Sequence, residues 1–166
     1  MKLISLLALI FGISMSTIAE PVRIETDSFL LELPSTWKIE ELSSQAKLIG
    51  PNNEYLIVSS YRITGKGSEA DLQHIRDEFG ENISATMIQA SREPDLKVTL
   101  PLTKELSLSG SPIWHIETET KDASQFYNLY GAVGLKVALL VTLEGELSHK
   151  ETSKVVSNAI KNITWH

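Results

Sequence analysis

A run of short segments in which apolar and polar residues alternate constrains the fold more than any other feature of the sequence. Alternation with a period of two is typical of β-strands, because successive side chains point to opposite faces of a sheet. The connections are too short for a crossover, so consecutive strands are expected to be antiparallel. The predicted strands of this run are residues 96–100, 103–109, 112–120, 124–132 and 135–143.

The last of these segments carries apolar residues on both of its faces. Leu139 and Val141 lie on one face, and Ala138 and Leu140 lie on the other. A strand that is apolar on both sides is covered on both sides. Residues 135–143 are therefore predicted to form an interior strand.

Two more strands are predicted before this run. Residues 28–33 alternate and end at Pro34, where a turn leads to Trp37, and residues 54–63 are rich in β-branched and aromatic residues. Residues 39–50 are ambiguous and weakly helical by the spacing of their apolar side chains.

Two amphipathic helices complete the predicted elements. The first follows Ser68, a good N-cap residue with Asp71 three positions later. The second covers residues 146–163, with three lysines outside its apolar stripe. The apolar stripe of the first helix consists of Leu72, Ile75, Phe79, Ile83 and Met87.

Together these elements predict a single α+β domain over residues 20–166, built as an α/β/α sandwich. Its mainly antiparallel sheet has about six or seven strands. One long helix follows the early strands, and another helix lies at the C-terminus.

The first nineteen residues have the pattern of a secretory signal peptide, with Lys2 before an apolar stretch and Thr17-Ile18-Ala19 before Glu20. The apolar stretch has eleven residues, and a bilayer span needs roughly 20, so stable membrane insertion is not expected. No cysteine follows the stretch, which excludes a bacterial lipid anchor. We expect cleavage after Ala19 and a periplasmic protein of a Gram-negative bacterium, or alternatively a secreted one.

Composition excludes several classes of function. The chain has 15 Lys and Arg against 21 Asp and Glu, a net charge of -6, which disfavours a nucleic-acid partner. The absence of cysteine excludes a disulfide scaffold and a thiolate metal site. The four histidines are far apart in the sequence, so no metal motif is present and no cofactor is expected.

No catalytic motif is present either. Gly65-Lys66-Gly67-Ser68 precedes a helix, but it lacks the spacing of a phosphate-binding loop. The nucleophile elbow Gly-x-Ser-x-Gly does not occur. The sequence therefore predicts no catalytic residues.

Four dispersed stretches carry a resemblance to a known family. They are Phe29-Leu-Leu-Glu-Leu-Pro-Ser-Thr-Trp37, Leu106-Ser-Leu-Ser-Gly-Ser-Pro-Ile-Trp114, Gly134-Leu-Lys-Val-Ala-Leu-Leu-Val141 and Val156-Ser-Asn-Ala-Ile160. In these stretches and in the order of its elements, the chain resembles the PsbP-like, or Mog-type, superfamily. The resemblance implies an antiparallel sheet with helices on both faces, used mainly to bind other proteins and to assist assemblies. It implies no shared catalytic residues, and some members are exported bacterial proteins of unassigned role.

One group of residues is predicted to meet on the sheet. If Asp122 and Ala123 form a two-residue turn, His115 lies opposite Tyr130 and Glu117 lies opposite Asn128 on one face. His115 and Glu117 alone leave a tetrahedral metal site half empty, so we expect a polar face without a metal. The predicted partner-binding residues, on an exposed face, are His115, Glu117, Asn128 and Tyr130.

The leading functional hypothesis is a non-enzymatic periplasmic module that binds a protein partner. It would be an accessory to an envelope assembly or an immunity-type inhibitor of a toxin. The first alternative is a carrier of a small apolar ligand, which would need a cavity between the sheet and a helix. An uncharacterised hydrolase is the third possibility, and it would need titratable groups that converge in a cleft.

Overall fold

The computed structural model describes residues 19–64 and 68–166. The predicted signal peptide, apart from Ala19, lies outside the described residues, as do Gly65, Lys66 and Gly67 of the glycine-rich turn. Seven antiparallel strands form the main sheet, in the order β3-β4-β5-β9-β8-β7-β6. They are β3 (Lys38–Leu42), β4 (Gln45–Ile49), β5 (Tyr55–Arg62), β6 (Leu96–Leu106), β7 (Pro112–Thr120), β8 (Gln125–Val133) and β9 (Val137–Glu146).

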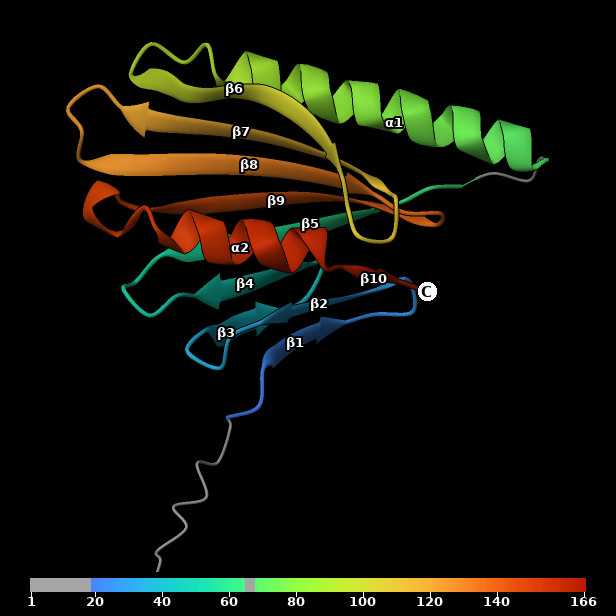
Figure 1. The fold of residues 1–166 in the computed structure, drawn as a ribbon, viewed down its shortest axis with the longest axis horizontal. Coiled ribbons are helices and arrows are strands. Elements are labelled where there is room, and N and C mark those ends of the chain that lie inside the picture. The colour runs from blue at the N-terminus through green and yellow to red at the C-terminus, as the bar shows by residue number, and fades with distance from the viewer. Residues whose placement is uncertain (1–18, 65–67) are drawn as a thin grey trace, which may run out of the picture.

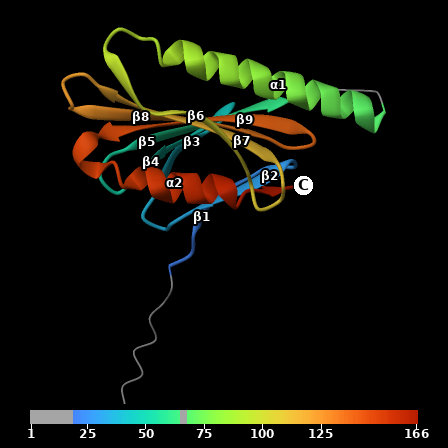
Figure 2. The same cartoon turned by 45° about the horizontal axis from the view of Figure 1, so that its top comes forward.

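Different elements cover the two faces of this sheet (Figures 1 and 2). Helix α1 (Glu69–Ala90) packs on β6 to β9 from one side. Helix α2 (Thr152–Lys161) lies on the other side, together with a small sheet of order β1-β2-β10. The strands of the small sheet are β1 (Val22–Glu25), β2 (Phe29–Leu33) and β10 (Thr164–Trp165). The predicted α/β/α sandwich is confirmed, and β9 is an interior strand between β5 and β8 as expected.

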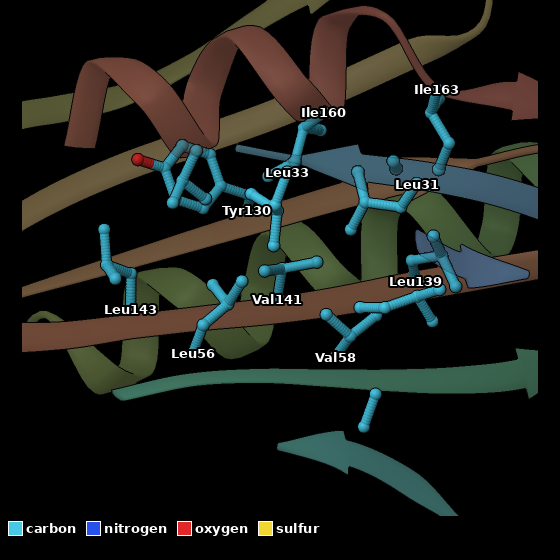
Figure 3. Packing of buried hydrophobic residues seen from close by; sticks show 14 of the residues in the cluster. Leu31, Leu33, Leu56, Val58, Tyr130, Leu139, Val141, Leu143, Ile160 and Ile163 are labelled. Atoms are coloured by element: carbon cyan, nitrogen blue, oxygen red, sulfur yellow. The ribbon is translucent and has the colours of Figure 1, made fainter. Parts of the chain in front are cut away.

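Two hydrophobic cores hold the layers together. The larger core lies between the main sheet and the layer made by α2 and the small sheet. Figure 3 shows side chains such as Leu33 of β2, Ile160 of α2 and Val141 of β9 meeting there. The second core lies beneath α1 and includes Met87 and Trp114. Each fully buried large apolar side chain contributes about 1.5–3 kcal/mol to folding.

Close approach of α1 to the sheet depends on two glycines. Gly80 of α1 lies against the ring of Trp114, and Gly131 of β8 lies against Ile83. A β-carbon at either glycine would collide with these side chains. The helix begins with the predicted cap, since the Ser68 hydroxyl accepts from the Asp71 amide and the Ser68 amide donates to the Asp71 carboxylate.

The weakly helical interpretation of residues 39–50 is wrong. These residues form the β3–β4 hairpin, with Ala46 and Leu48 of β4 buried at alternate positions. The register shifts between Ile39 and Glu41 of β3, so the apolar residues of this edge strand lose their period-two spacing. Ile39 and Leu42 are exposed, and their helix-like spacing does not reflect a buried face.

Other boundaries also differ from the sequence-based ones. Residues 96–100 and 103–109 were expected to be separate, but most of this stretch forms the single strand β6, whose register shifts on both sides of Leu100. Strand β9 continues to Glu146, and a 3-10 turn at Leu147–His149 follows, so the last helix starts only at Thr152. Strands β1 and β10 were not predicted.

Candidate functional site

The β7–β8 hairpin brings the four predicted partner-binding residues together as expected. His115 lies opposite Tyr130, and Glu117 lies opposite Asn128. The connection has four residues, 121–124, rather than the expected two, and the Ala123 amide closes its turn by donating to the Thr120 carbonyl at 2.9 Å. Because the longer connection takes one more residue from each strand, the register is the same, and Ala123 takes a left-handed backbone conformation with a φ of 57°. The predicted pairing is confirmed.

The expectation that this face is exposed is wrong. Asn128 and Tyr130 are each only 1% exposed, and the side chains of His115 and Glu117 are 14% and 18% exposed. Helix α2 lies over this face. Its Ser153 accepts two hydrogen bonds from the sheet: one from the Asn128 amide to the Ser153 hydroxyl at 2.6 Å, and one from the Tyr130 hydroxyl to the Ser153 carbonyl at 3.3 Å. The role of the four residues in partner binding stays a prediction.

We name these four residues, together with Glu119, Lys150 and Ser153, the α2 cluster. Lys150 precedes α2 and reaches back to two strand carboxylates: its amine lies 3.2 Å from Glu117 Oε2 and 2.8 Å from Glu119 Oε1. Burial alone would lower the pKa of Lys150, but hydrogen bonds to Glu119 and Glu117 outweigh this and raise it. The lysine therefore stays charged and ties the start of α2 to β7.

The two aromatic side chains of the α2 cluster, His115 and Tyr130, carry no charge at neutral pH. The His115 ring stacks on Tyr130, with centroids 4.3 Å apart and planes at 16°. Burial lowers the pKa of His115, although Glu117, whose Oε1 lies 3.5 Å from Nε2, opposes this. Burial also raises the pKa of the Tyr130 hydroxyl. Both side chains are therefore neutral near pH 7.

The α2 cluster is thus a network of hydrogen bonds and ion pairs that holds α2 and the preceding Lys150 against the sheet. The Lys150 amine occupies the position between Glu117 and Glu119 where a cation would bind. Across residues 19–64 and 68–166, no group of three or more His, Cys, Asp or Glu side chains could hold a metal ion. His115, Glu117 and Lys150 line none of the five surface clefts described by the structure, which measure about 220 to 510 Å³.

A second polar contact holds the start of α2, between Thr152 and Glu54, and the sequence analysis did not predict it. Glu54 is fully buried, and its carboxylate accepts hydrogen bonds from the Asn52 amide at 2.9 Å and from the Thr152 hydroxyl at 2.5 Å. Burial alone would raise the pKa of Glu54, but the hydrogen bonds from Thr152 and Asn52 outweigh it, and the pKa is lowered. The only signal in the sequence was a carboxylate placed between an Asn-rich turn and a strand.

An accessible surface with two tyrosines lies on the side of the sheet that carries α1, beside that helix. Tyr55 and Tyr61 of β5 are 47% and 44% exposed and point to this side with Ile57. On β9, Thr142 lies opposite Ile57, Leu140 lies opposite Ser59 and Glu144 lies opposite Tyr55. We name Tyr55, Ile57, Tyr61, Leu140 and Thr142 the tyrosine face. A cleft of about 300 Å³ continues it toward α1, lined by Tyr61, Phe79, Asn82, Ile83, Thr86 and Leu140.

The comparisons with known proteins bear on the fold alone. No protein-family model matches the chain, and no curated protein matches it. Two solved structures are similar over nearly their whole length. The PsbP protein CyanoP of Synechocystis sp. PCC 6803 has a TM-score of 0.55 and 15% identity, with 92% of this chain and 96% of CyanoP covered. The fold is PsbP-like.

The second similar structure is LpqN of Mycobacterium tuberculosis, described as involved in cell envelope biogenesis. It has a TM-score of 0.54 and 13% identity, with 91% of this chain and 87% of LpqN covered. At such identities the PsbP-like fold is what these proteins share with the chain. None of the helices that the structure describes is long and apolar enough to cross a membrane.

Within this PsbP-like fold, the two sides of the sheet differ in what they offer a partner. On one side, α2 and the small sheet close over the α2 cluster and Glu54. On the other, α1 packs on β6 to β9, while Tyr55 and Tyr61 of β5 stay accessible. The residues predicted to bind a partner are thus mostly covered, and two tyrosines not singled out for binding are accessible.

Proposed function

We propose that the chain is a non-enzymatic, exported module that binds a protein partner through the tyrosine face. In the periplasm it would act as an accessory to an envelope assembly or as an immunity-type inhibitor. The observation that carries this proposal is the pair of half-exposed rings, Tyr55 and Tyr61, on either side of Ile57 on a rigid interior strand.

The chemistry of the tyrosine face suits a protein partner. Tyrosine is enriched in protein interfaces, because it buries a large apolar ring while its hydroxyl keeps a polar contact. Tyr61 also packs against Phe79 of α1, with centroids 6.4 Å apart, which restricts the ring before binding. An ion pair between Lys47 and Glu41 adds charge on the neighbouring strands, as expected of a polar rim.

The similar structures support this proposal at the level of the fold. LpqN is described as involved in cell envelope biogenesis, and CyanoP is a cyanobacterial PsbP. A role in the cell envelope agrees with the description of LpqN and with the predicted signal peptide.

The absence of an enzymatic role is part of the proposal. The four titratable groups of the α2 cluster that lie side by side, His115, Glu117, Glu119 and Lys150, lie under α2 and line none of the described clefts. Catalysis needs such groups to reach a substrate. Lys150 pairs with both carboxylates, and the His115 ring stacks on Tyr130, so these groups hold α2 against the sheet instead.

One observation favours the alternative of a small-ligand carrier. The cleft beside α1 is lined mainly by apolar side chains, including Phe79, Ile83 and Leu140, and its volume of about 300 Å³ is at the lower end for ligand pockets. Because this cleft adjoins the tyrosine face, a carrier would use part of the same surface. Saturation binding of a fluorescent fatty acid, lost on Thr86→Trp at an exposed position of the cleft lining, would favour the carrier.

Site-specific photocrosslinking tests the proposal. A photoreactive phenylalanine at position 55 or 61 should give a discrete crosslinked protein in intact cells, because both positions are accessible. The same residue at Leu108, which is 83% exposed on the β6–β7 loop, is the matched control and should give none. Identical adducts from all three positions, or adducts from Leu108 alone, would contradict binding through the tyrosine face.

A further inference from the structure

We propose that the free edge of β1 pairs with β1 of a second copy of the chain, antiparallel and centred on Ile24. This contact joins the small sheets of two molecules into one. It uses the opposite side of the fold from the tyrosine face, so it does not rest on the proposed function.

Strand β1 is an edge strand with unpaired backbone groups. Among the residues that the structure describes, it pairs with β2 only, and in both views it lies at the outer margin of the fold (Figures 1 and 2). The Thr26 amide donates to the Phe29 carbonyl at the turn, so Thr26 and Phe29 are a hydrogen-bonded pair. Because such pairs alternate along an antiparallel ladder, Ile24 also bonds to β2, whereas Arg23 and Glu25 direct their N–H and C=O groups outward.

These outward groups restrict how two β1 strands can pair. Arg23 and Glu25 must lie opposite residues that also direct their backbone groups outward, which leaves registers centred on residue 23, 24 or 25. The register centred on 23 places Arg23 against Arg23 of the second copy, and the one centred on 25 places Glu25 against Glu25. Only the register centred on Ile24 places Arg23 opposite Glu25 twice, by symmetry. Opposite charges directly across a strand pair stabilise it, and like charges destabilise it.

The charged side chains are placed to make these contacts. Arg23 and Glu25 both point to the solvent face of the small sheet, where Arg23 is 60% exposed. Arg23 Nε already lies 2.8 Å from Glu32 Oε1. The remaining guanidinium N–H groups can donate to a second carboxylate, because arginine carries five such donors.

A cleft lies beside the edge of β1 that would meet the second copy. Ile24 lines a cleft of about 370 Å³ between the small sheet and the β3–β4 turn, together with Leu42, Ala46 and Val58. Leu42 is 62% exposed there. Ile24 is itself only 5% exposed and is held in the core of each copy, so what the register centred on Ile24 brings beside the open side of this cleft is the backbone of the second copy's β1.

Sedimentation velocity of the purified chain, with its N-terminus determined by mass spectrometry, tests the proposal. The wild type should form a concentration-dependent dimer. Arg23→Glu and Glu25→Arg should each weaken dimerisation by about tenfold or more, because each replaces two attractive pairs with two repulsive ones. Lys38→Glu on β3, the edge strand of the main sheet, is the matched control and should leave dimerisation unchanged.

A mixture of the two charge-reversed variants gives the sharpest result. The Arg23→Glu copy carries two carboxylates on β1 and the Glu25→Arg copy carries two cations, so the mixture should recover dimer to within about threefold of the wild type. The double variant Arg23→Glu/Glu25→Arg should recover it alone. A wild type that stays monomeric at millimolar concentration, variants that dimerise like the wild type, or a mixture without recovery would each overturn the proposal.

Discussion

We predict that the hydrogen bond from Thr152 to Glu54 contributes more to the free energy of unfolding than most other single contacts of α2. The variant Thr152→Val replaces the hydroxyl by a methyl group of similar size. In the wild type this hydroxyl is buried, with Thr152 5% exposed, and donates at 2.5 Å to a carboxylate that is fully buried. The variant leaves Glu54 with its two hydrogen bonds from Asn52.

The expected loss follows from the charge and burial of the acceptor. A hydrogen bond to a charged group contributes about 1.5–3 kcal/mol, and a buried carboxylate without it retains part of its desolvation cost. We therefore expect the free energy of unfolding to fall by about 2 kcal/mol for Thr152→Val. For a domain of this size, that corresponds to a fall in Tm of roughly 6 °C.

Urea unfolding followed by circular dichroism measures this loss, and pH adds a second test. The pKa of Glu54 is lowered in the folded state, so its contribution is present above the unfolded value and is lost as pH falls through the folded pKa. The difference between wild type and variant should thus be largest near neutral pH and shrink in acid. Thr86→Val, at an exposed hydroxyl on α1 that bonds only to the Asn82 carbonyl, is the control. Equal losses for both variants, or a difference independent of pH, would refute the reasoning.

Two further predictions concern α1 and the α2 cluster. Gly80→Ala should lower the free energy of unfolding by about 1–3 kcal/mol, because the added methyl group meets the Trp114 ring. The same urea titration measures this loss, and an unchanged midpoint would contradict the close approach of α1 to Trp114. His115→Phe keeps the stack on Tyr130 but removes a titrating group whose pKa is lowered by burial. The wild type should therefore lose stability relative to this variant as pH falls from about 7 toward 5, since the unfolded chain binds the proton more readily; parallel pH profiles for the two proteins would count against it.

The order of elements and the β7–β8 register could be predicted because they depend on local patterns. Alternating side chains and a short turn centred between Asp122 and Ala123 fix which residues face each other across the hairpin, whether two residues or the observed four connect the strands. The same patterns do not indicate what covers a face. Asn128 looks alike whether it contacts water or the Ser153 hydroxyl, because the covering helix lies 25 residues away in the sequence.

The remaining differences have a similar origin. Strand β10 has only two residues and exists because it pairs with β2, which no local pattern reveals. Strand β3 is exposed along its whole length, so no buried side chains mark it. Tyr55 and Tyr61 fitted the predicted strand, but their exposure depends on α1 lying over β6 to β9 rather than over β5.

Chemical nitration of tyrosines, read by peptide mass spectrometry, tests most directly whether α2 closes one face of the sheet while the other stays open. Tyr55 and Tyr61 are nearly half exposed, and Tyr130 is 1% exposed beneath α2. We predict rapid nitration of Tyr55 and Tyr61 in the native protein and almost none at Tyr130 until the protein is unfolded. Nitration of Tyr130 as fast as Tyr61 under native conditions would contradict the closed α2 cluster and, with it, the choice of the tyrosine face.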